Sequence, residues 1–243
     1  MGRDLPDWGA LPGPLTVHEV TDLGELAARL GSVVTYHRGG IVVFVDDFAN
    51  GLTRWTTAIG GAGDVVDLSL VRTLSGPFSA RLLAASAVSP IAEIGLELPK
   101  QIASRMGGEF AFAVDTTTSI IELTLSQYDG SNLLRATVRY SPVDETLQYL
   151  DADGNYVTKA TGIALLTEAN VFHNMKLVTD LENEEYVKVL LDDTAYSLTD
   201  VALRKTASAL LERFSMLIWN RGRVGASDTV YVDRVIVTQN EPL

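Results

Sequence analysis

Residues 172–198 read FHNMKLVTDLENEEYVKVLLDDTAYSL, and this stretch decides the fold class. Apolar and polar side chains alternate in it, so that Met175 falls on one face of an extended chain and Lys176 on the other. Residues 181–185 and 192–194 are too polar to bury, and each predicts a chain reversal. A period of two that is bounded by turns is typical of antiparallel strands with one face in solvent. The stretch therefore predicts three strands that form a meander.

The same alternation continues through much of the chain. Segments 128–132 (YDGSN) and 151–155 (DADGN) separate the alternating runs and have the glycine, asparagine and aspartate content of tight turns. We find no repeat of fixed period, which argues against a propeller or a solenoid. Many short strands at regular spacing predict an all-β sandwich or jelly roll. The apolar positions that alternate are Phe110, Phe112 and Val114; Ile121, Leu123 and Leu125; and Leu134, Ala136, Val138 and Tyr140.

One segment conflicts with this pattern. Residues 201–214 (VALRKTASALLERF) have the composition of a helix, with leucine and alanine on a broad face. Tertiary contacts often override such a propensity in β-sandwiches. We predict a loop or one helical turn up to about residue 209, followed by a strand over residues 211–219.

The amino-terminal region differs from the rest. Residues 1–17 carry three prolines, which remove backbone donors and favour an extended arm. Thr21 and Asp22 can cap a helix, and the leucine spacing that follows predicts a short amphipathic helix over about residues 22–30. The chain thus divides into an arm at 1–40 and a sandwich at 41–243, and the arm is either a free terminus or an anchor on a neighbouring subunit. Its candidate anchors are Leu5, Trp8, Leu11, Leu23, Leu26 and Leu30.

Composition excludes several classes of function. The net charge of −12 argues against binding to nucleic acid or to anionic lipid, both of which require a surplus of basic residues. The chain has no cysteine, so disulfides, thiolate metal sites and a cysteine nucleophile are excluded. The first residues lack the basic and apolar regions of a secretory signal, and no apolar stretch approaches the length of a membrane span. These features predict synthesis in the cytosol.

Three further stretches carry a family resemblance. Residues 46–55 (DDFANGLTRW), 76–82 (GPFSARL) and 229–237 (TVYVDRVIV) resemble the opening, second and closing strands of laminin-G-like and carbohydrate-binding jelly-roll modules. The 172–198 meander is similar to that of concanavalin A-like sandwiches. The resemblance covers about residues 42–240 and implies a concanavalin A-like jelly roll that follows the arm. It does not define a function, because this architecture hosts lectins, glycosidases and viral coat proteins.

The resemblance also implies a structural calcium site. Related modules hold the ion where the first and last strands meet, which corresponds to Asp46 or Asp47 with Asp233 here. Such hard oxygen ligands suit calcium. The alternative is that Asp47 only starts a turn and Asp233 faces water. Residues 151–155 imitate the start of an EF-hand loop, but the later ligands are missing, so we expect a turn there.

Catalytic residues are not apparent. A retaining glycosidase of this fold would carry paired carboxylates on one strand, such as E-x-D-x-x-E, and the sequence contains no such run. His18, His37 and His173 are too scattered for a metal triad or a Ser-His-Asp arrangement. We therefore predict a protein that is not an enzyme and that needs no cofactor other than calcium.

Sugar binding would require exposed aromatic side chains, because the apolar faces of sugars stack on rings. Tyr128, Tyr149 and Tyr156 lie near turns and are the candidate glycan contacts. Trp55 falls at a position that is core in the similar modules, and Trp219 shares a strand with Leu217, so both are expected in the core.

Two functions remain open. The first is a structural virion subunit, such as a phage capsid decoration or accessory protein, which would form a homo-oligomer or bind other capsid proteins through the arm. An acidic body, cytosolic synthesis and an apolar arm favour this function. The alternative is a lectin-like carbohydrate-binding module, which would act outside the cell.

Overall fold

The computed structural model describes residues 40–85, 90–114, 120–167, 171–224 and 226–242. The arm anchors and the helix expected at 22–30 lie outside these residues, as do His18 and His37. The described residues form sixteen β-strands and no helix, so they offer no candidate for a helix that spans a membrane. The prediction of an all-β fold is confirmed.

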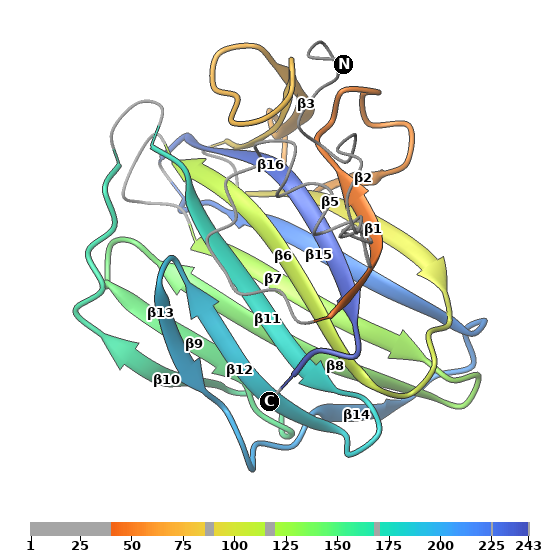
Figure 1. Ribbon diagram of the computed structural model, residues 1–243. Coiled ribbons are helices and arrows are strands. Elements are labelled where there is room, and N and C mark those ends of the chain that lie inside the picture. Colours follow the sequence, from red (N-terminus) through yellow and green to blue (C-terminus); the bar gives the residue numbers. More distant parts are fainter. Residues whose placement is uncertain (1–39, 86–89, 115–119, 168–170, 225, 243) are drawn as a thin grey trace, which may run out of the picture.

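The strands form two antiparallel sheets of eight strands each, packed face to face (Figure 1). Sheet A has the order β13-β12-β11-β6-β16-β4-β3, with β1 paired to β16. Its strands are β1 (Ile41–Asp46), β3 (Val65–Ser69), β4 (Ser79–Ala84), β6 (Arg105–Val114), β11 (His173–Asp180), β12 (Glu185–Leu191), β13 (Thr194–Ser197) and β16 (Asp228–Gln239).

Sheet B has the order β10-β9-β8-β7-β15-β5-β2, with β14 paired to β8. Its strands are β2 (Thr56–Ile59), β5 (Ile91–Pro99), β7 (Ile120–Tyr128), β8 (Asn132–Ser141), β9 (Thr146–Leu150), β10 (Tyr156–Thr161), β14 (Arg204–Ala207) and β15 (Arg213–Arg221). Strands that lie far apart in the sequence are neighbours in both sheets, as expected for a jelly roll.

The core lies between the sheets and is built from the predicted alternating positions. Phe110 and Phe112 of sheet A and Leu123 of sheet B are fully buried in it. The next residue on each strand points to the opposite, outer face of its sheet because successive strand side chains alternate. The tight turns are also confirmed, with Gly130 and Gly154 at φ values of 91° and 90° that favour glycine.

The 172–198 meander forms β11, β12 and β13, as predicted. A β-bulge between Val178 and Thr179 turns Tyr186 into the core. The Tyr186 hydroxyl donates to the carbonyl of Leu150 over 2.7 Å and accepts from the amide of Thr137 at 2.8 Å. Tyr186 of sheet A thus satisfies backbone groups of sheet B.

The prediction that the other face of the meander is in solvent is wrong. Lys176 is only 2% exposed because the carboxyl-terminal residues fold back over that face. Its ammonium group forms an ion pair of 2.6 Å with Glu241, whose side chain is equally buried. Lys188 on the next strand donates to the carbonyl of Pro242 at 3.4 Å. The polar side chain of Lys176, which alternates with core residues along β11, therefore did not indicate a solvent-exposed face of the sheet.

Residues 201–214 differ from the prediction in part. The strand expected over 211–219 is present as β15, but the preceding segment is not a simple loop or helical turn. It contains β14, which pairs with residues 132–135 of β8. Leu203 just before it is 3% exposed and joins the core. The backbone hydrogen bonds to β8 outweigh the helical propensity of this segment.

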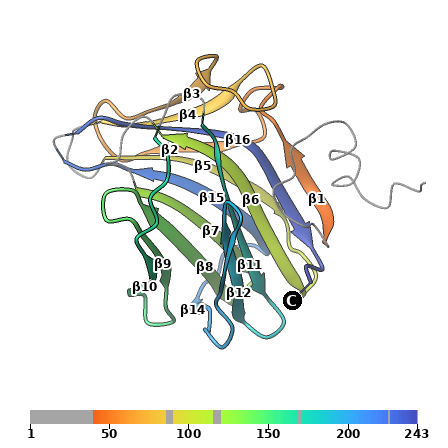
Figure 2. The same cartoon turned by 60° about the vertical axis from the view of Figure 1, so that its left-hand side comes forward.

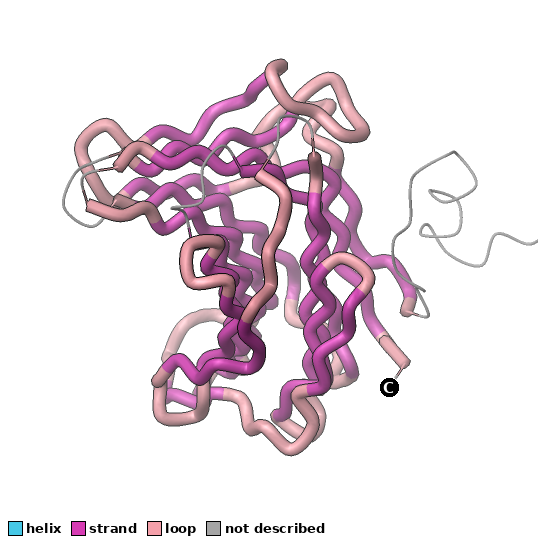
Figure 3. The backbone as a smooth tube through the Cα atoms, turned by 90° about the vertical axis from the view of Figure 1, so that its left-hand side faces the viewer, coloured by secondary structure: helices cyan, strands magenta, loops and turns pink. Residues whose placement is uncertain are grey.

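Residues 162–167 connect β10 of sheet B towards β11 of sheet A. They run between the two layers along one open side of the sandwich (Figures 2 and 3). Ile163 and Leu165 pack against the core from this side. We call these residues the 162–167 segment.

Candidate functional site

The outer face of sheet B carries a line of side chains that faces away from the core. Strand register places one residue from each of seven neighbouring strands directly beside the next. We call this line the cross-strand row. Its members, in order across the sheet, are Ala58, Glu93, Trp219, Glu122, Arg139, Gln148 and Thr158.

One half of the row is a chain of hydrogen bonds. The Arg139 Nε atom donates to Gln148 Oε1 at 2.7 Å, and Gln148 Nε2 donates to Thr158 Oγ1 at 3.1 Å. The guanidinium of Arg139 also lies 3.4 Å from the centroid of the Tyr156 ring. These contacts fix the position of Arg139 and leave its terminal nitrogen atoms for other partners.

Glu122 is the charged centre of the row. It is 2% exposed, and Arg221 binds both of its oxygen atoms at 2.9 and 3.0 Å. The Tyr156 hydroxyl donates to Glu122 Oε2 at 2.6 Å. Burial, reinforced by the adjacent carboxylate, raises the pKa of Tyr156 to about 12, so the phenol stays protonated. A bidentate pair of this kind is strong and has a fixed geometry.

The other half of the row surrounds Trp219. This indole is half-buried, and the guanidinium of Arg221 lies 4.1 Å from its ring centroid. Glu93 beside it forms no hydrogen bond with any residue in the described part of the chain. Partial burial raises the pKa of Glu93 and is the largest effect. The positive charge of Arg221 lowers this pKa, and the negative charge of Glu122 raises it. Among the described residues, Glu93 is therefore an acceptor without a hydrogen bond, next to a half-buried aromatic ring.

The three tyrosines predicted as glycan contacts lie in three different places in the structure. Tyr156 belongs to the site, where it joins Glu122 and Arg139. Tyr128 is on the same outer face but at its other end, stacked on Arg213 at 4.5 Å. Tyr149 instead points into the core, where its ring meets that of Tyr186 at 5.9 Å. Tyr149 therefore lies on the inner side of sheet B, away from the cross-strand row.

The tryptophan predictions also have different outcomes. Trp55 is 7% exposed in the core, as expected, and its indole nitrogen donates to Asp46 at 3.0 Å. Trp219 is not in the core: Met216 and Ile218 take the core positions of β15, and Trp219 points outward with Leu217. The alternation of Phe214, Met216 and Ile218 was the signal that could have shown this.

Sequence reasoning missed the charged members of the site. Glu93, Glu122 and Arg139 each lie between two residues of the core, and Arg221 is the last residue of β15. A charge between two core residues marks the outer face of a strand, but it does not reveal its partners. Those depend on the register between strands that are up to 99 residues apart, as Glu122 and Arg221 are.

The predicted calcium ligands already have hydrogen-bond partners. The two carboxylate oxygens of Asp46 accept from the Phe48 amide and the Trp55 indole. Asp233 accepts from the amide of Leu74 at 2.6 Å and from the hydroxyl of Ser75 at 2.9 Å. Within the described ranges, no three histidine or carboxylate side chains gather as a metal site. Calcium binding stays a prediction, which a calcium titration followed by the melting temperature tests.

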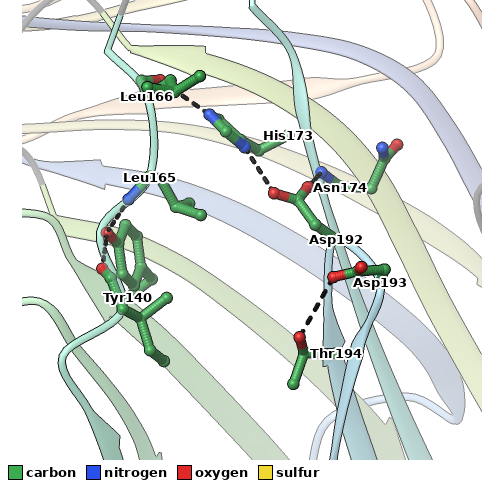
Figure 4. A network of polar contacts seen from close by, with 9 residues as sticks. Tyr140, Leu165, Leu166, His173, Asn174, Asp192, Asp193 and Thr194 are labelled. Carbon is green, nitrogen blue, oxygen red and sulfur yellow. Dashed lines mark hydrogen bonds and ion pairs between the residues drawn. The ribbon is translucent and has the colours of Figure 1, made fainter.

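His173, the third histidine of the sequence, lies on β11 of sheet A, so the core separates it from the cross-strand row. His173 contacts the Asp192 carboxylate at 2.7 Å and the Leu166 carbonyl at 2.8 Å (Figure 4).

Residues 151–155 form a turn in which the Asn155 amide donates to Asp151, as expected in place of an EF-hand.

Comparison with known proteins identifies the fold. No family model and no curated protein matches the sequence. Among solved structures, a protein with a galectin-like fold from Bacillus subtilis has a TM-score of 0.54 at 11% identity and covers 84% of this chain and 98% of its own. A carbohydrate esterase from the Shiga toxin-encoding bacteriophage phi24B has a TM-score of 0.53 at 14% identity, with coverage of 84% and 100%.

Two other solved structures are also similar to this chain. The carbohydrate recognition domain of Emp46p has a TM-score of 0.50 at 12% identity and covers 86% of this chain and 98% of its own. The chain also matches a sialidase with a TM-score of 0.51 at 13% identity, over 82% of this chain, but it spans only 19% of the length of that protein. At such identities the likeness is one of fold alone. The chain thus has the concanavalin A-like jelly-roll fold that the sequence predicted, and one of the matched structures is described as galectin-like.

Proposed function

We propose that this protein binds a glycan on the outer face of sheet B, at the cross-strand row. The observation that carries the proposal is the half-buried indole of Trp219 with a carboxyl group at each side: Glu93, which forms no hydrogen bond among the described residues, and Glu122, which Arg221 fixes. Aromatic rings bind the apolar faces of sugars, and carboxylate, amide and guanidinium groups bind their hydroxyls. The carbohydrate recognition domain of Emp46p, one of the proteins with a similar fold, supports this proposal.

The row is suited to binding because its side chains are already ordered. Arg139 is held by Gln148 and by the Tyr156 ring, and Arg221 is held by Glu122. Side chains that are fixed before binding lose little conformational entropy when the ligand arrives. Glu93 would accept from sugar hydroxyls, while the terminal nitrogens of Arg139 would donate to ring or hydroxyl oxygens.

We take the role to be binding and not bond cleavage. Glycoside hydrolysis requires two carboxyl groups that flank the scissile bond, and in this row Glu93 could supply only one of them. Glu122 has both oxygen atoms engaged by Arg221 and Tyr156. An assay for release of reducing sugar from each polysaccharide that binds tests this part of the proposal.

Binding can be measured on the full chain with a panel of neutral and acidic oligosaccharides. We expect at least one of them to raise the melting temperature and to give a saturable titration by calorimetry. Trp219→Ala should abolish the shift. Tyr128→Ala, on the same face but away from the row, is the matched control and should retain it. No response to any oligosaccharide, or equal loss in both variants, would contradict the proposal.

A second candidate function is the structural virion subunit. Its support is an exposed apolar loop after β3, in which Leu70 and Val71 are each 74% exposed and Leu74 is 40% exposed. Exposed apolar groups of this kind are typical of protein contact sites. One structural match comes from a bacteriophage. Under this hypothesis, deletion of residues 1–31 leaves the sandwich folded and abolishes incorporation into particles, whereas unchanged incorporation would refute it.

The two functions imply different places of action and can coexist in one protein. A virion subunit would be made in the host cytoplasm and would form homo-oligomers or bind other capsid proteins. A glycan-binding module would act outside the cell. Sedimentation of the purified chain distinguishes a self-associating subunit from a monomeric module.

A further inference from the structure

Both ring nitrogens of His173 face oxygen atoms that can only accept hydrogen bonds. Nδ1 lies 2.7 Å from the carboxylate of Asp192, and Nε2 lies 2.8 Å from the carbonyl of Leu166 (Figure 4). A neutral imidazole has one N–H group and one lone pair, so it can donate to only one of them. Both contacts are hydrogen bonds only in the imidazolium form, with a proton on each nitrogen.

The two acceptors belong to different parts of the fold. Asp192 lies in the turn between β12 and β13, and its other oxygen accepts from the Asn174 amide at 2.8 Å. Leu166 belongs to the 162–167 segment, which closes one open side of the sandwich (Figure 3). His173 thus attaches this segment to sheet A.

The opposite attachment of the segment is made by neutral groups. The Tyr140 hydroxyl of β8 donates to the Ile163 carbonyl at 2.6 Å and accepts from the Leu165 amide at 3.4 Å. The Ile163 amide donates to the carbonyl of Glu145 at 3.0 Å. The attachment to sheet B should therefore be insensitive to pH near neutrality, whereas the attachment to sheet A depends on one proton.

We propose that His173 is a proton-dependent switch that holds the 162–167 segment against sheet A when it is charged and releases the segment when it is neutral. On losing a proton, the ring keeps its N–H on the charged carboxylate of Asp192, the stronger acceptor. The lone pair on Nε2 then faces the lone pairs of the Leu166 carbonyl, and this contact becomes repulsive. Release would loosen Ile163 and Leu165, which cover the core at this side.

The surroundings of His173 define the pH range. Asp192 faces the ring directly, Phe112 of β6 packs against it at 5.8 Å, and Arg234 of β16 is held by the neighbouring Asn174. Burial alone would lower the pKa of His173, but the bonds to Asp192 and Leu166 outweigh it and raise the pKa above the ordinary 6.5. The stabilisation is therefore fully present below pH 6.5 and is lost as the pH rises through the raised value.

Amide hydrogen exchange of the full chain tests the switch. Protection factors, corrected for the intrinsic effect of pH, should fall roughly tenfold in the 162–167 segment between pH 5.5 and pH 9, as expected for loss of one charge-assisted hydrogen bond. The β7–β8 hairpin should show no such change. In His173→Gln the segment should lose its pH dependence. Protection that is constant with pH, or the same pH dependence in His173→Gln, would overturn the proposal.

A second measurement tests the proposal on the wild-type protein and does not depend on whether His173→Gln folds. Long-range proton–nitrogen spectra of the wild-type imidazole should show two protonated nitrogens at pH 6 and one at pH 9. Asp192→Asn should move this transition to lower pH because the charged acceptor is removed. A neutral ring at pH 6, or an unchanged transition in Asp192→Asn, would contradict the assignment.

Discussion

Tyr156 on β10 donates its phenolic hydrogen to Glu122 on β7 over 2.6 Å, across the two strands that separate them in sheet B. This bond joins the edge of the sheet to its centre. It also holds an aromatic ring beside the carboxylate that Arg221 neutralises. The candidate binding face is therefore ordered by charge pairs instead of by the core, and its residues can be changed without creating a cavity between the sheets.

Replacement of Glu122 by glutamine should lower the free energy of unfolding by about 1–3 kcal/mol. The change removes the charge that Arg221 binds through two hydrogen bonds, and it leaves a partly buried guanidinium without its counter-ion. Urea denaturation measures the difference. Glu97→Gln is the matched control, since Glu97 is an exposed glutamate on β5 that pairs with Arg213 at 3.2 Å. Its effect should be within about 0.5 kcal/mol, and equal losses in both variants would count against this account.

Tyr186→Phe should destabilise the protein by about 1–3 kcal/mol. The hydroxyl bonds to the carbonyl of Leu150 and the amide of Thr137, and its removal leaves these buried backbone groups unsatisfied. Tyr149→Phe is the control, because the ring of Tyr149 packs on Tyr186 while its hydroxyl bonds to no group in the described part of the chain. Thermal and urea unfolding of the two variants should differ clearly; a negligible loss in Tyr186→Phe would show that the bond between the sheets contributes little.

Asp64 should control stability in acid. It accepts hydrogen bonds from the amides of Gly61, Ala85 and Ile91 at 2.6–2.9 Å. Burial alone would raise its pKa, but these backbone bonds outweigh burial and lower the pKa below 3.8. Its stabilisation is therefore present above pH 3.8 and is lost as the pH falls through the lowered value.

The matching measurement compares melting temperatures of the wild type and Asp64→Asn from pH 2.5 to pH 6. The variant should be less stable at pH 6, and the difference should shrink towards the acid end of the range. A difference that stays constant with pH would mean that the carboxylate charge of Asp64 has no part in stability.

The sequence predicted the architecture well because the core positions follow a period of two. Met175 and Leu177, for example, lie in the core as their spacing indicated. Where the prediction failed, contacts distant in the sequence decided the outcome. Lys176 is buried by Glu241, 65 residues away. The helix-like segment before β15 contains β14 because residues 132–135 of β8 extend beyond β9, which pairs only with residues 138–141.

The candidate site was harder to predict than the fold. Tyr156 was found from its place beside a turn, but Trp219 was assigned to the core with Leu217, although both point outward. The row exists only because three strand registers align Glu93, Trp219, Glu122 and Arg139 across the sheet. No local pattern encodes that alignment, so it requires the structure.

The most direct test of the central claim is calorimetric titration of the oligosaccharide that binds best into wild type, Trp219→Ala and Tyr128→Ala. We predict that Trp219→Ala weakens binding by roughly tenfold or more, because it removes the ring on which the sugar stacks. Tyr128→Ala should bind as the wild type does, and both variants should unfold at nearly the wild-type temperature. Unchanged affinity in Trp219→Ala would contradict glycan binding at the cross-strand row.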